Sequence, residues 1–373
     1  MNFTNVLKDD EKIIFGLREL YSGYGYSQYK MNKFEEYDLY VRNKDFLVSE
    51  NIITFTDTNG KLMALKPDVT LSIIKNREDD PESLQKVYYH ENVYRVSGST
   101  KAFREILQVG LECVGAIDPY CIYEVLTLAV KSLYMISDDC MLDISHLGAV
   151  SDAIAVLGCS PTAADKLLKC VGEKNIHGIS DVCRQEGIDE EKASFLKALI
   201  STYGSPAAVI PKLEVLSNEY GSESLRKLIS ICKFIKDCGF SEKMHIDFSV
   251  INDMGYYNGI VFKGFINGVP TGILSGGQYD KLMKKMGKKS KALGFAVYLD
   301  LLERFWDNSD QYDVDAVLLY GEDVDVSALD AKISSLRAEG MSVTAQKSLP
   351  KNLRYKKLLA IKNGEVVCLA NNA

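Results

Sequence analysis

A long helical stretch divides the strand-like segments of this chain into two groups. From Ala149 to about Asp237 the apolar residues recur with the spacing of amphipathic helices. Strand-like segments bounded by glycine, asparagine or short polar turns lie before this stretch and return after it, from Met244 onward. This order predicts the α+β class, with one antiparallel sheet that is flanked by helices and carries a long helical insertion.

The end of the chain predicts a small unit of its own. Residues 311–373 have the pattern of a βαβ unit followed by a hairpin, and about 60 residues is near the lower size limit for independent folding. We therefore expect a main domain over 1–310, with the helical insertion at about 149–240, and a small α/β domain over 311–373.

Composition restricts the class of protein. The net charge is −7, which argues against a strong, sequence-independent grip on nucleic acid. No apolar run reaches the roughly 18–20 residues that a membrane span needs, and the N-terminus lacks the apolar core of a signal peptide. The nine cysteines form no Cys-x-x-Cys pair. These features predict a cytoplasmic protein with no membrane partner.

One local charge run departs from the acidic average. Six lysines lie between Lys281 and Lys291, in the segment "KLMKKMGKKSK". A solvated loop around Gly287 is the ordinary interpretation and the one we favour. The alternative is a docking patch for an acidic partner or for RNA.

Two segments predict a ligand pocket, although each also has an ordinary structural explanation. In "EILQVGLECVG" the alternation places Gln108, Gly110 and Glu112 on one strand face, where the glycine leaves room for a ligand. An exposed strand face would carry the same residues. In "LKPDVT", Asp68 and Thr70 supply oxygen acceptors at the start of a helix near Pro67, and plain N-terminal capping would use them as well.

The stretch "GYYNG" adds two neighbouring tyrosines between glycines. Because adjacent strand residues face opposite sides, only one of Tyr256 and Tyr257 is expected to point squarely into a pocket. Two β-favouring aromatics in a core are the alternative. The four histidines show no metal-ligand spacing, and no cysteine lies in a nucleophile motif. We therefore expect no metal, no cofactor and no catalytic residue of these kinds.

The order of these segments is more specific than any one of them. It resembles the catalytic domain of histidyl-tRNA synthetase, and still more its paralogue family, the regulatory subunits of ATP phosphoribosyltransferase. The likeness covers roughly residues 5–305 and rests on "FTDTNGKLMALKPDVT", "YYHENVYRVSGSTKAFREILQVGLECVG", "GYYNGIVFKG", "GGQYDKL" and "ALGFAVYLDLLE". It implies a dimeric class II aminoacyl-tRNA synthetase-like fold, and it implies a shortened anticodon-binding-like domain at the C-terminus.

The resemblance also implies a histidine pocket. Asp68, Thr70 and Gln108 would surround the α-amino group of the ligand. Glu112 would accept from one imidazole nitrogen, and Tyr257 would bond the other, with Tyr256 lining the site. Carboxylate and amide oxygens suit an ammonium, and an acceptor and a hydroxyl at opposite edges suit an imidazole ring.

The chain departs from the synthetase pattern at its cations. Arg95 remains as a possible phosphate-contacting remnant, but its acidic partner is replaced by Ser97, and two further arginines by Asn252 and Leu301. Lys66 also stands near the pocket residues in place of an arginine. Losing one transition-state cation typically costs about 3–4 kcal/mol, so loss of adenylation is expected.

These features predict a non-catalytic regulatory subunit. It would bind histidine as effector, form a homodimer within a hetero-oligomer, and assemble with the short-form ATP phosphoribosyltransferase catalytic subunit in feedback control of histidine biosynthesis. tRNA is not an expected partner, because a basic surface is missing from the C-terminal unit. Two alternatives stay open: a divergent histidyl-tRNA synthetase and a free-standing histidine-binding paralogue.

Overall fold

The computed structural model describes residues 7–43, 52–97, 100–237, 239–251, 256–302, 312–362 and 364–372. The chain separates into two compact units, Met1–Glu303 and Arg304–Ala373. Within the described ranges, no helix is both long enough and apolar enough to cross a membrane.

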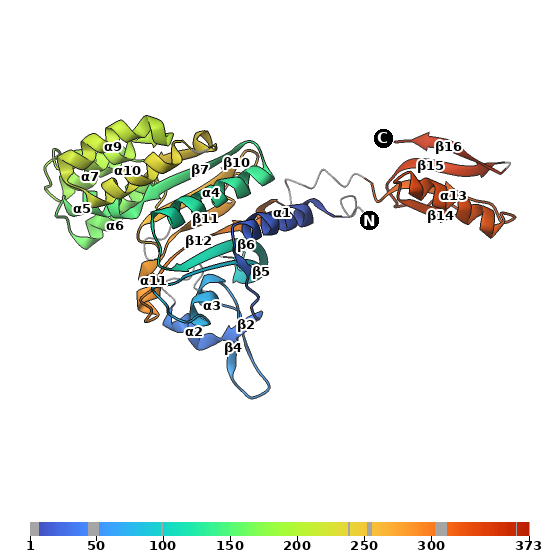
Figure 1. Ribbon diagram of the computed structural model, residues 1–373, viewed down its shortest axis with the longest axis horizontal. Helices are drawn as coiled ribbons and strands as arrows, with labels where there is room; N and C mark the ends of the chain where they lie inside the picture. The colour runs from blue at the N-terminus through green and yellow to red at the C-terminus, as the bar shows by residue number, and fades with distance from the viewer. Residues whose placement is uncertain are drawn as a thin grey trace. The chain divides into compact units, whose positions relative to one another are not determined.

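A mixed sheet forms the centre of the first unit (Figure 1). Nine strands follow one another across it within the described residues, in the order β1 (Ser27–Gln28), β5 (Leu84–Val96), β6 (Phe103–Gly115), β12 (Lys291–Tyr298), β11 (Leu274–Gln278), β10 (Ile260–Ile266), β7 (Cys140–His146), β9 (Met244–Asp247) and β8 (Tyr203–Gly204). The pairs from β5 through to β7 are all antiparallel, whereas β1 with β5 and β7 with β9 are parallel. The predicted α+β class, with an antiparallel sheet flanked by helices, is confirmed.

Two helices, α1 (Asp9–Gly23) and α4 (Pro119–Ile136), lie along one face of this sheet (Figure 1). Tyr21 of α1 is fully buried, and its ring lies 6.0 Å from that of Phe295 on β12. Leu133 of α4 approaches so closely that a Cβ on Gly264 of β10 would lie 2.6 Å from it. Side chains alternate between the two faces along β6. Gln108 and Glu112 point to the face of the sheet that α1 and α4 do not cover.

The predicted helical insertion consists of short helices that pack on one another at one end of the sheet (Figure 1). They are α5 (Leu147–Ala155), α6 (Pro161–Gly172), α7 (Ile176–Gln185), α8 (Ser194–Ile200), α9 (Pro206–Tyr220) and α10 (Glu223–Ile235). Within this stretch the chain also forms β8, which the helical pattern does not predict. Tyr203 of β8 pairs with Asp247 of β9, so a two-residue segment completes the sheet edge through tertiary contacts that periodicity cannot reveal.

A smaller sheet stands beside the central one, in the order β2 (Phe34–Glu36), β4 (Leu62–Leu65) and β3 (Thr54–Thr56). A turn that contains Asn59 and Gly60 joins β3 to β4, and the Asp57 carboxylate accepts from the backbone amides of Asn59 and Lys61. The helix that follows, α3 (Thr70–Lys75), begins three residues after the predicted start at Pro67. The reason is local: Asp68 Oδ1 accepts from the Leu71 amide at 2.9 Å, as a capping residue does, so Asp68 precedes the helix.

The second unit is an α/β sheet with the order β14 (Val343–Gln346), β13 (Val314–Leu319), β15 (Tyr355–Lys362) and β16 (Glu365–Asn371). The helix α13 (Val326–Ala338) connects the parallel strands β13 and β14. Its Leu329, Ile333 and Leu336 pack on the apolar side chains of the sheet, which gives the unit a small core of its own.

Candidate functional site

A cavity of about 330 Å³ opens on the face of the central sheet that α1 and α4 do not cover. Its floor consists of residues from β5, β6, β12 and β11, and its rim of the segment before α3 and the segments before β10 and after β11. The volume is at the lower end of the range of about 300–1,000 Å³ for small-molecule sites. All six predicted pocket residues line it: Asp68, Thr70, Gln108, Glu112, Tyr256 and Tyr257.

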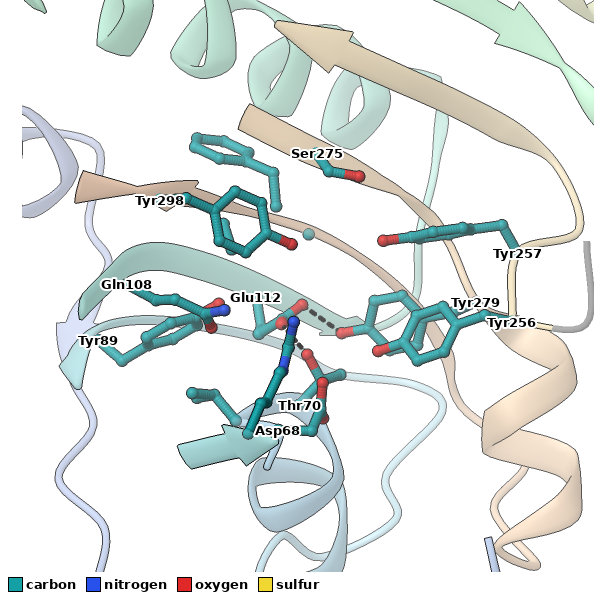
Figure 2. Close-up of a pocket in the computed structure, with 15 residues that line it drawn as sticks. Asp68, Thr70, Tyr89, Gln108, Glu112, Tyr256, Tyr257, Ser275, Tyr279 and Tyr298 are labelled. Atoms are coloured by element: carbon teal, nitrogen blue, oxygen red, sulfur yellow. Dashed lines mark hydrogen bonds between the residues drawn. The ribbon is translucent and has the colours of Figure 1, made fainter. Parts of the chain in front are cut away.

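Glu112 lies at the centre of this site and is only 2% exposed. The Thr70 hydroxyl donates to Glu112 Oε1 at 2.6 Å, and the Tyr279 hydroxyl donates to Oε2, so a hydroxyl holds each carboxylate oxygen (Figure 2). Burial raises the pKa of Glu112 to about 8, although the two hydroxyl donors act in the opposite direction. The structure therefore places a carboxyl group in the pocket that forms no ion pair with any of the residues described.

Two glycines shape the floor around Glu112. Gly294 pairs with Glu112 across β12 and β6, and a Cβ on Gly294 would lie 1.8 Å from Glu112 Oε2. A Cβ on Gly110 would lie 2.5 Å from the Tyr89 hydroxyl. The sequence predicts that the space above Gly110 is open for a ligand. In the structure the Tyr89 side chain from β5 occupies this space instead. Gly294 is the glycine that makes room for the Glu112 carboxylate.

Asp68 and Arg95 lie at the rim near the start of α3. Burial raises the pKa of Asp68, and the Leu71 amide and the positive charge of Arg95 partly offset this effect. Arg95 Nε donates to the Pro67 carbonyl oxygen at 3.0 Å, which ties the guanidinium to the turn that presents Asp68. Asp68 thus lines the cavity while its carboxylate accepts from the Leu71 amide.

The two neighbouring tyrosines both line the cavity (Figure 2). They precede β10, which begins at Ile260, so strand alternation does not govern their directions, and the expectation that only one points squarely into the pocket stays a prediction. Their ring centroids lie 4.7 Å apart, edge to face. Tyr256 is buried against Tyr279 and the core beside it, whereas Tyr257 is half-buried and lies nearer to Ser275 (Figure 2).

Eight further lining residues were not predicted, and the four with side-chain hydroxyls are Tyr89, Ser275, Tyr279 and Tyr298. Tyr279 lies within the segment "SGGQYD", whose glycine pair indicates only a turn when it is considered alone. Tyr89 and Tyr298 are register partners of Gly110 and Gln108, respectively, so knowledge of the strand pairing would have identified both. Burial raises the pKa of each of these tyrosines, and they stay neutral hydroxyl donors.

Positive charge is scarce around the cavity. Among the described residues that line it, Arg95 is the single cationic side chain. Leu301 lies in the 3-10 turn Leu299–Leu302, half-buried, and Ser97 follows the end of β5; neither lines the cavity. Asn252 and Arg304 lie outside the described residues.

Lys66, which precedes the Asp68 segment in the chain, does not line the cavity either. Its side chain is 1% exposed, and its ammonium forms an ion pair with Glu91 of β5. Lys66 therefore has a structural contact that the linear sequence does not show.

No group of three or more potential metal ligands occurs among the described residues. His146 is buried at the end of β7, and this burial lowers its pKa to about 4. His245 Nδ1 lies 2.7 Å from the Tyr203 hydroxyl at the far edge of the sheet. Both histidines are thus separate from the cavity.

Comparison with known proteins places this chain in a family. A family model for histidyl-tRNA synthetase matches residues 6–302. A protein of Caldanaerobacter subterraneus subsp. tengcongensis, named ATP phosphoribosyltransferase regulatory subunit, is 30% identical over 288 residues, which cover 76% of this chain and 75% of that protein. The chain belongs to the ATP phosphoribosyltransferase regulatory subunit family. The likeness predicted from the order of the motifs is thereby confirmed.

Solved structures agree on the fold. The crystal structure of an ATP phosphoribosyltransferase regulatory subunit/histidyl-tRNA synthetase from Bacillus halodurans C matches with a TM-score of 0.74 at 24% identity, covering 94% of this chain and 93% of that one. A chain of the ATP phosphoribosyl transferase complex from Thermotoga maritima matches with a TM-score of 0.60 at 20% identity, covering 80% and 97%. The predicted class II synthetase-like fold is therefore confirmed.

Proposed function

We propose that this chain is a non-catalytic regulatory subunit of ATP phosphoribosyltransferase that binds histidine in the Glu112 cavity. It would form a homodimer, assemble in the cytoplasm with a short-form catalytic subunit, and relay feedback inhibition of histidine biosynthesis. The family supports the regulatory role, and the Thermotoga maritima complex is an assembly of the same kind. Histidine as the ligand rests on the chemistry of the cavity.

The imidazole ring fits between Glu112 and Tyr257. An imidazole presents two nitrogens at opposite edges, and it is matched by a carboxylate acceptor on one side and a hydroxyl on the other. Both groups line the cavity from different directions, Glu112 from the floor and Tyr257 from the segment before β10 (Figure 2). Because Thr70 and Tyr279 hold Glu112 in place, its orientation is set before a ligand arrives.

The α-amino group fits near Asp68, Thr70 and Gln108. An ammonium needs acceptors, and these side chains offer a carboxylate, a hydroxyl and an amide oxygen. Thr70 donates its only hydroxyl proton to Glu112, so the lone pairs of its oxygen are available to accept from the ligand. Thr70 would thus contact the α-amino group directly and the imidazole ring indirectly, through Glu112.

Adenylation would need more positive charge than the cavity offers. A synthetase stabilises the negative charge that develops on the α-phosphate, and each missing donor costs about 3–4 kcal/mol, or 100–1,000-fold in rate. Arg95 is one cation, and its Nε is already engaged with the Pro67 carbonyl. We therefore expect histidine binding without useful formation of histidyl-adenylate.

The single observation that carries this proposal is the buried Glu112 carboxyl held by Thr70 and Tyr279 in a cavity of amino-acid size. Isothermal titration of histidine into the purified chain tests it. Wild type should bind, Glu112→Gln should bind at least about tenfold more weakly because the amide replaces one acceptor oxygen by a donor, and Glu105→Gln should bind like wild type. Glu105 is the matched control, an exposed carboxylate on the same strand.

Two outcomes would contradict the proposal in different ways. If wild type shows no heat of binding with histidine, the ligand assignment is wrong. If the chain alone supports histidine-dependent ATP–pyrophosphate exchange at the rate of a charging enzyme, the chain is a divergent histidyl-tRNA synthetase and the non-catalytic assignment fails.

A further inference from the structure

Two short helices begin at the Glu112 carboxylate. Thr70 is the first residue of α3, and its hydroxyl donates to one carboxylate oxygen. Tyr279 directly precedes α11 (Asp280–Lys285), and its hydroxyl donates to the other oxygen (Figure 2). The two hydroxyls that hold the central acid of the pocket therefore belong to the starts of two different helices.

The same two helices are joined again where they end. The Asp79 carboxylate, four residues beyond α3, accepts from the backbone amides of Lys289 and Ser290 at 2.7 and 3.0 Å and from the Ser290 hydroxyl at 2.7 Å. These hydrogen bonds hold the pKa of Asp79 low, at about 2. Lys288 Nζ donates to the Arg77 carbonyl oxygen at 2.5 Å. The loop after α11 is thus fastened to the loop after α3.

Apolar packing fills the space between these two connections. Leu71 and Ile74 of α3 lie in one buried cluster with Leu282 and Met283 of α11 and with Tyr279. Since close-packed cores transmit displacement instead of absorbing it, α3 and α11 form one mechanical unit. Its inner end is at Glu112 and its outer end is at Asp79. We call it the α3–α11 unit.

The outer end of the α3–α11 unit carries the lysine run of the sequence. Lys288 has a structural contact, but the side chains of Lys284, Lys289 and Lys291 are exposed. None of these three takes part in an ion pair within the part of the chain that the structure describes. A concentrated positive surface on a chain of net charge −7 favours an acidic partner.

A concave surface adjoins these lysines. A cavity of about 500 Å³ lies between α2 (Tyr37–Arg42) and the end of α11, with Arg42, Lys75 and Lys285 among its lining residues. Lys75 is the last residue of α3, so both helices of the unit end at this cavity. Glu36 and Asp38 also line this cavity, Arg42 pairs with Asp38 and Lys75 pairs with Glu35, so the positive charge offered to a partner comes from the three exposed lysines beside the cavity.

We propose that the outer end of the α3–α11 unit is a docking surface for an acidic protein partner, and that the unit couples this surface to occupancy of the Glu112 pocket. This inference rests on the proposed function, in which the partner is the catalytic subunit. A ligand that donates a hydrogen bond to Glu112 competes with the Thr70 and Tyr279 hydroxyls for the carboxylate oxygens, and this shifts the α3–α11 unit relative to β6. Ligand binding and partner docking are then coupled, because the ligand-free and the ligand-bound arrangements of the unit present different surfaces to the partner.

Charge reversal tests the docking surface. Lys284→Glu, Lys289→Glu and Lys291→Glu are combined in the full chain, and the control combines Lys166→Glu, Lys192→Glu and Lys212→Glu, three exposed lysines of the helical insertion. Both variants change the net charge equally. Assembly with the catalytic subunit is measured by sedimentation velocity at about 50 mM and about 500 mM salt, where screening differs strongly.

At low salt, the variant with the three reversed lysines is expected to assemble with the catalytic subunit at least about tenfold more weakly than wild type. The control variant should assemble within about twofold of wild type. Equal assembly of all three proteins would overturn the docking surface. So would an RNA titration in which wild type binds RNA, the reversed variant does not, and assembly is unaffected.

Release of the outer connection tests the coupling. Asp79→Ala removes the acceptor of the Lys289 and Ser290 amides, and Asp80→Ala changes the neighbouring carboxylate as the control. Asp79→Ala should bind histidine within about threefold of wild type, while the change that histidine causes in the assembly constant should fall at least about threefold. Retention of the full histidine effect in Asp79→Ala overturns the coupling.

Failure of the proposed function has a different signature. If wild type does not bind histidine, the pocket assignment and the coupling both fail, yet the assembly measurement still decides the docking surface. If histidine binds normally to every variant and only the reversed lysines lose assembly, the docking surface and the pocket are both supported.

Discussion

The substitution Glu112→Gln separates the pocket function of this carboxyl from its effect on stability. Gln keeps the shape, and the Thr70 and Tyr279 hydroxyls can rotate to meet its amide, since a hydroxyl both donates and accepts. What the substitution removes is a titratable group. In the folded chain the pKa of Glu112 is raised from 4.5 to about 8, so the folded state holds this proton more tightly than the unfolded state does.

The sign and size of the effect follow from proton linkage. A raised pKa contributes stability that is fully present below about pH 4.5 and is lost as the pH rises through about 8. At 1.36 kcal/mol per pKa unit, the free energy of unfolding of the ligand-free wild type falls by about 3–4 kcal/mol between about pH 5 and about pH 8 because of this group. The Gln variant lacks this loss. Asp68, whose pKa burial also raises, titrates in both proteins and cancels in the difference to first order.

Thermal melts of ligand-free wild type and Glu112→Gln over this pH range measure the difference. Relative to wild type, the variant should gain about 5–10 °C in melting temperature from about pH 5 to about pH 8. Histidine should raise the melting temperature of wild type but not of the variant. A difference that does not change with pH would refute the reasoning, because it would mean that Glu112 is not buried as a neutral acid. Glu105→Gln is the control for loss of a carboxylate on the same strand.

Three further substitutions test the site and its support. Gly294→Ala would place a Cβ 1.8 Å from Glu112 Oε2 and 2.4 Å from the Leu111 carbonyl oxygen. Histidine binding should therefore be lost and the melting temperature lowered. The control Gly23→Ala, whose Cβ meets nothing within 4 Å, should melt like wild type. Tyr257→Phe should weaken histidine binding by about 1–2 kcal/mol in calorimetry through loss of one hydrogen bond; unchanged affinity would remove its assigned role. Lys66→Met should lower the free energy of unfolding, measured in urea, by about 3 kcal/mol, because the Glu91 carboxylate loses its buried partner. Adding Glu91→Gln should restore part of this stability. A double variant as unstable as the single one would contradict this explanation.

Much of the site could be predicted because strand alternation is a strong constraint. Gln108 and Glu112 are four residues apart on one strand, so they must share a face wherever that strand lies in the sheet. Asp68 and Thr70 could be predicted as polar groups at a helix start, since the proline before them marks the position. What these patterns left open was whether the oxygens face a ligand or solvent.

The errors concern residues whose position depends on other strands. Tyr279 holds Glu112 across 167 positions of the chain, and no local pattern links the two. Tyr89 fills the space above Gly110 because β5 and β6 pair in one particular register. Lys66 pairs with Glu91, which is again a contact with a strand that sequence spacing does not reveal. Each of these contacts is long-range, and sequence spacing carries no direct information about it.

The sequence by itself determined the layout of the chain: a sheet interrupted by a helical insertion, and a set of motifs whose order identifies the family. Local periodicity and chain order carry this information, because each strand face and helix face repeats within a few residues. Only the tertiary structure decided that Glu112 is a buried acid, held by hydroxyls from the starts of two helices that are fastened together again at Asp79. Burial and hydrogen-bond partnership are properties of the packed sheet, since they arise where segments distant in the chain meet, and they set the protonation of the carboxyl at the centre of the site.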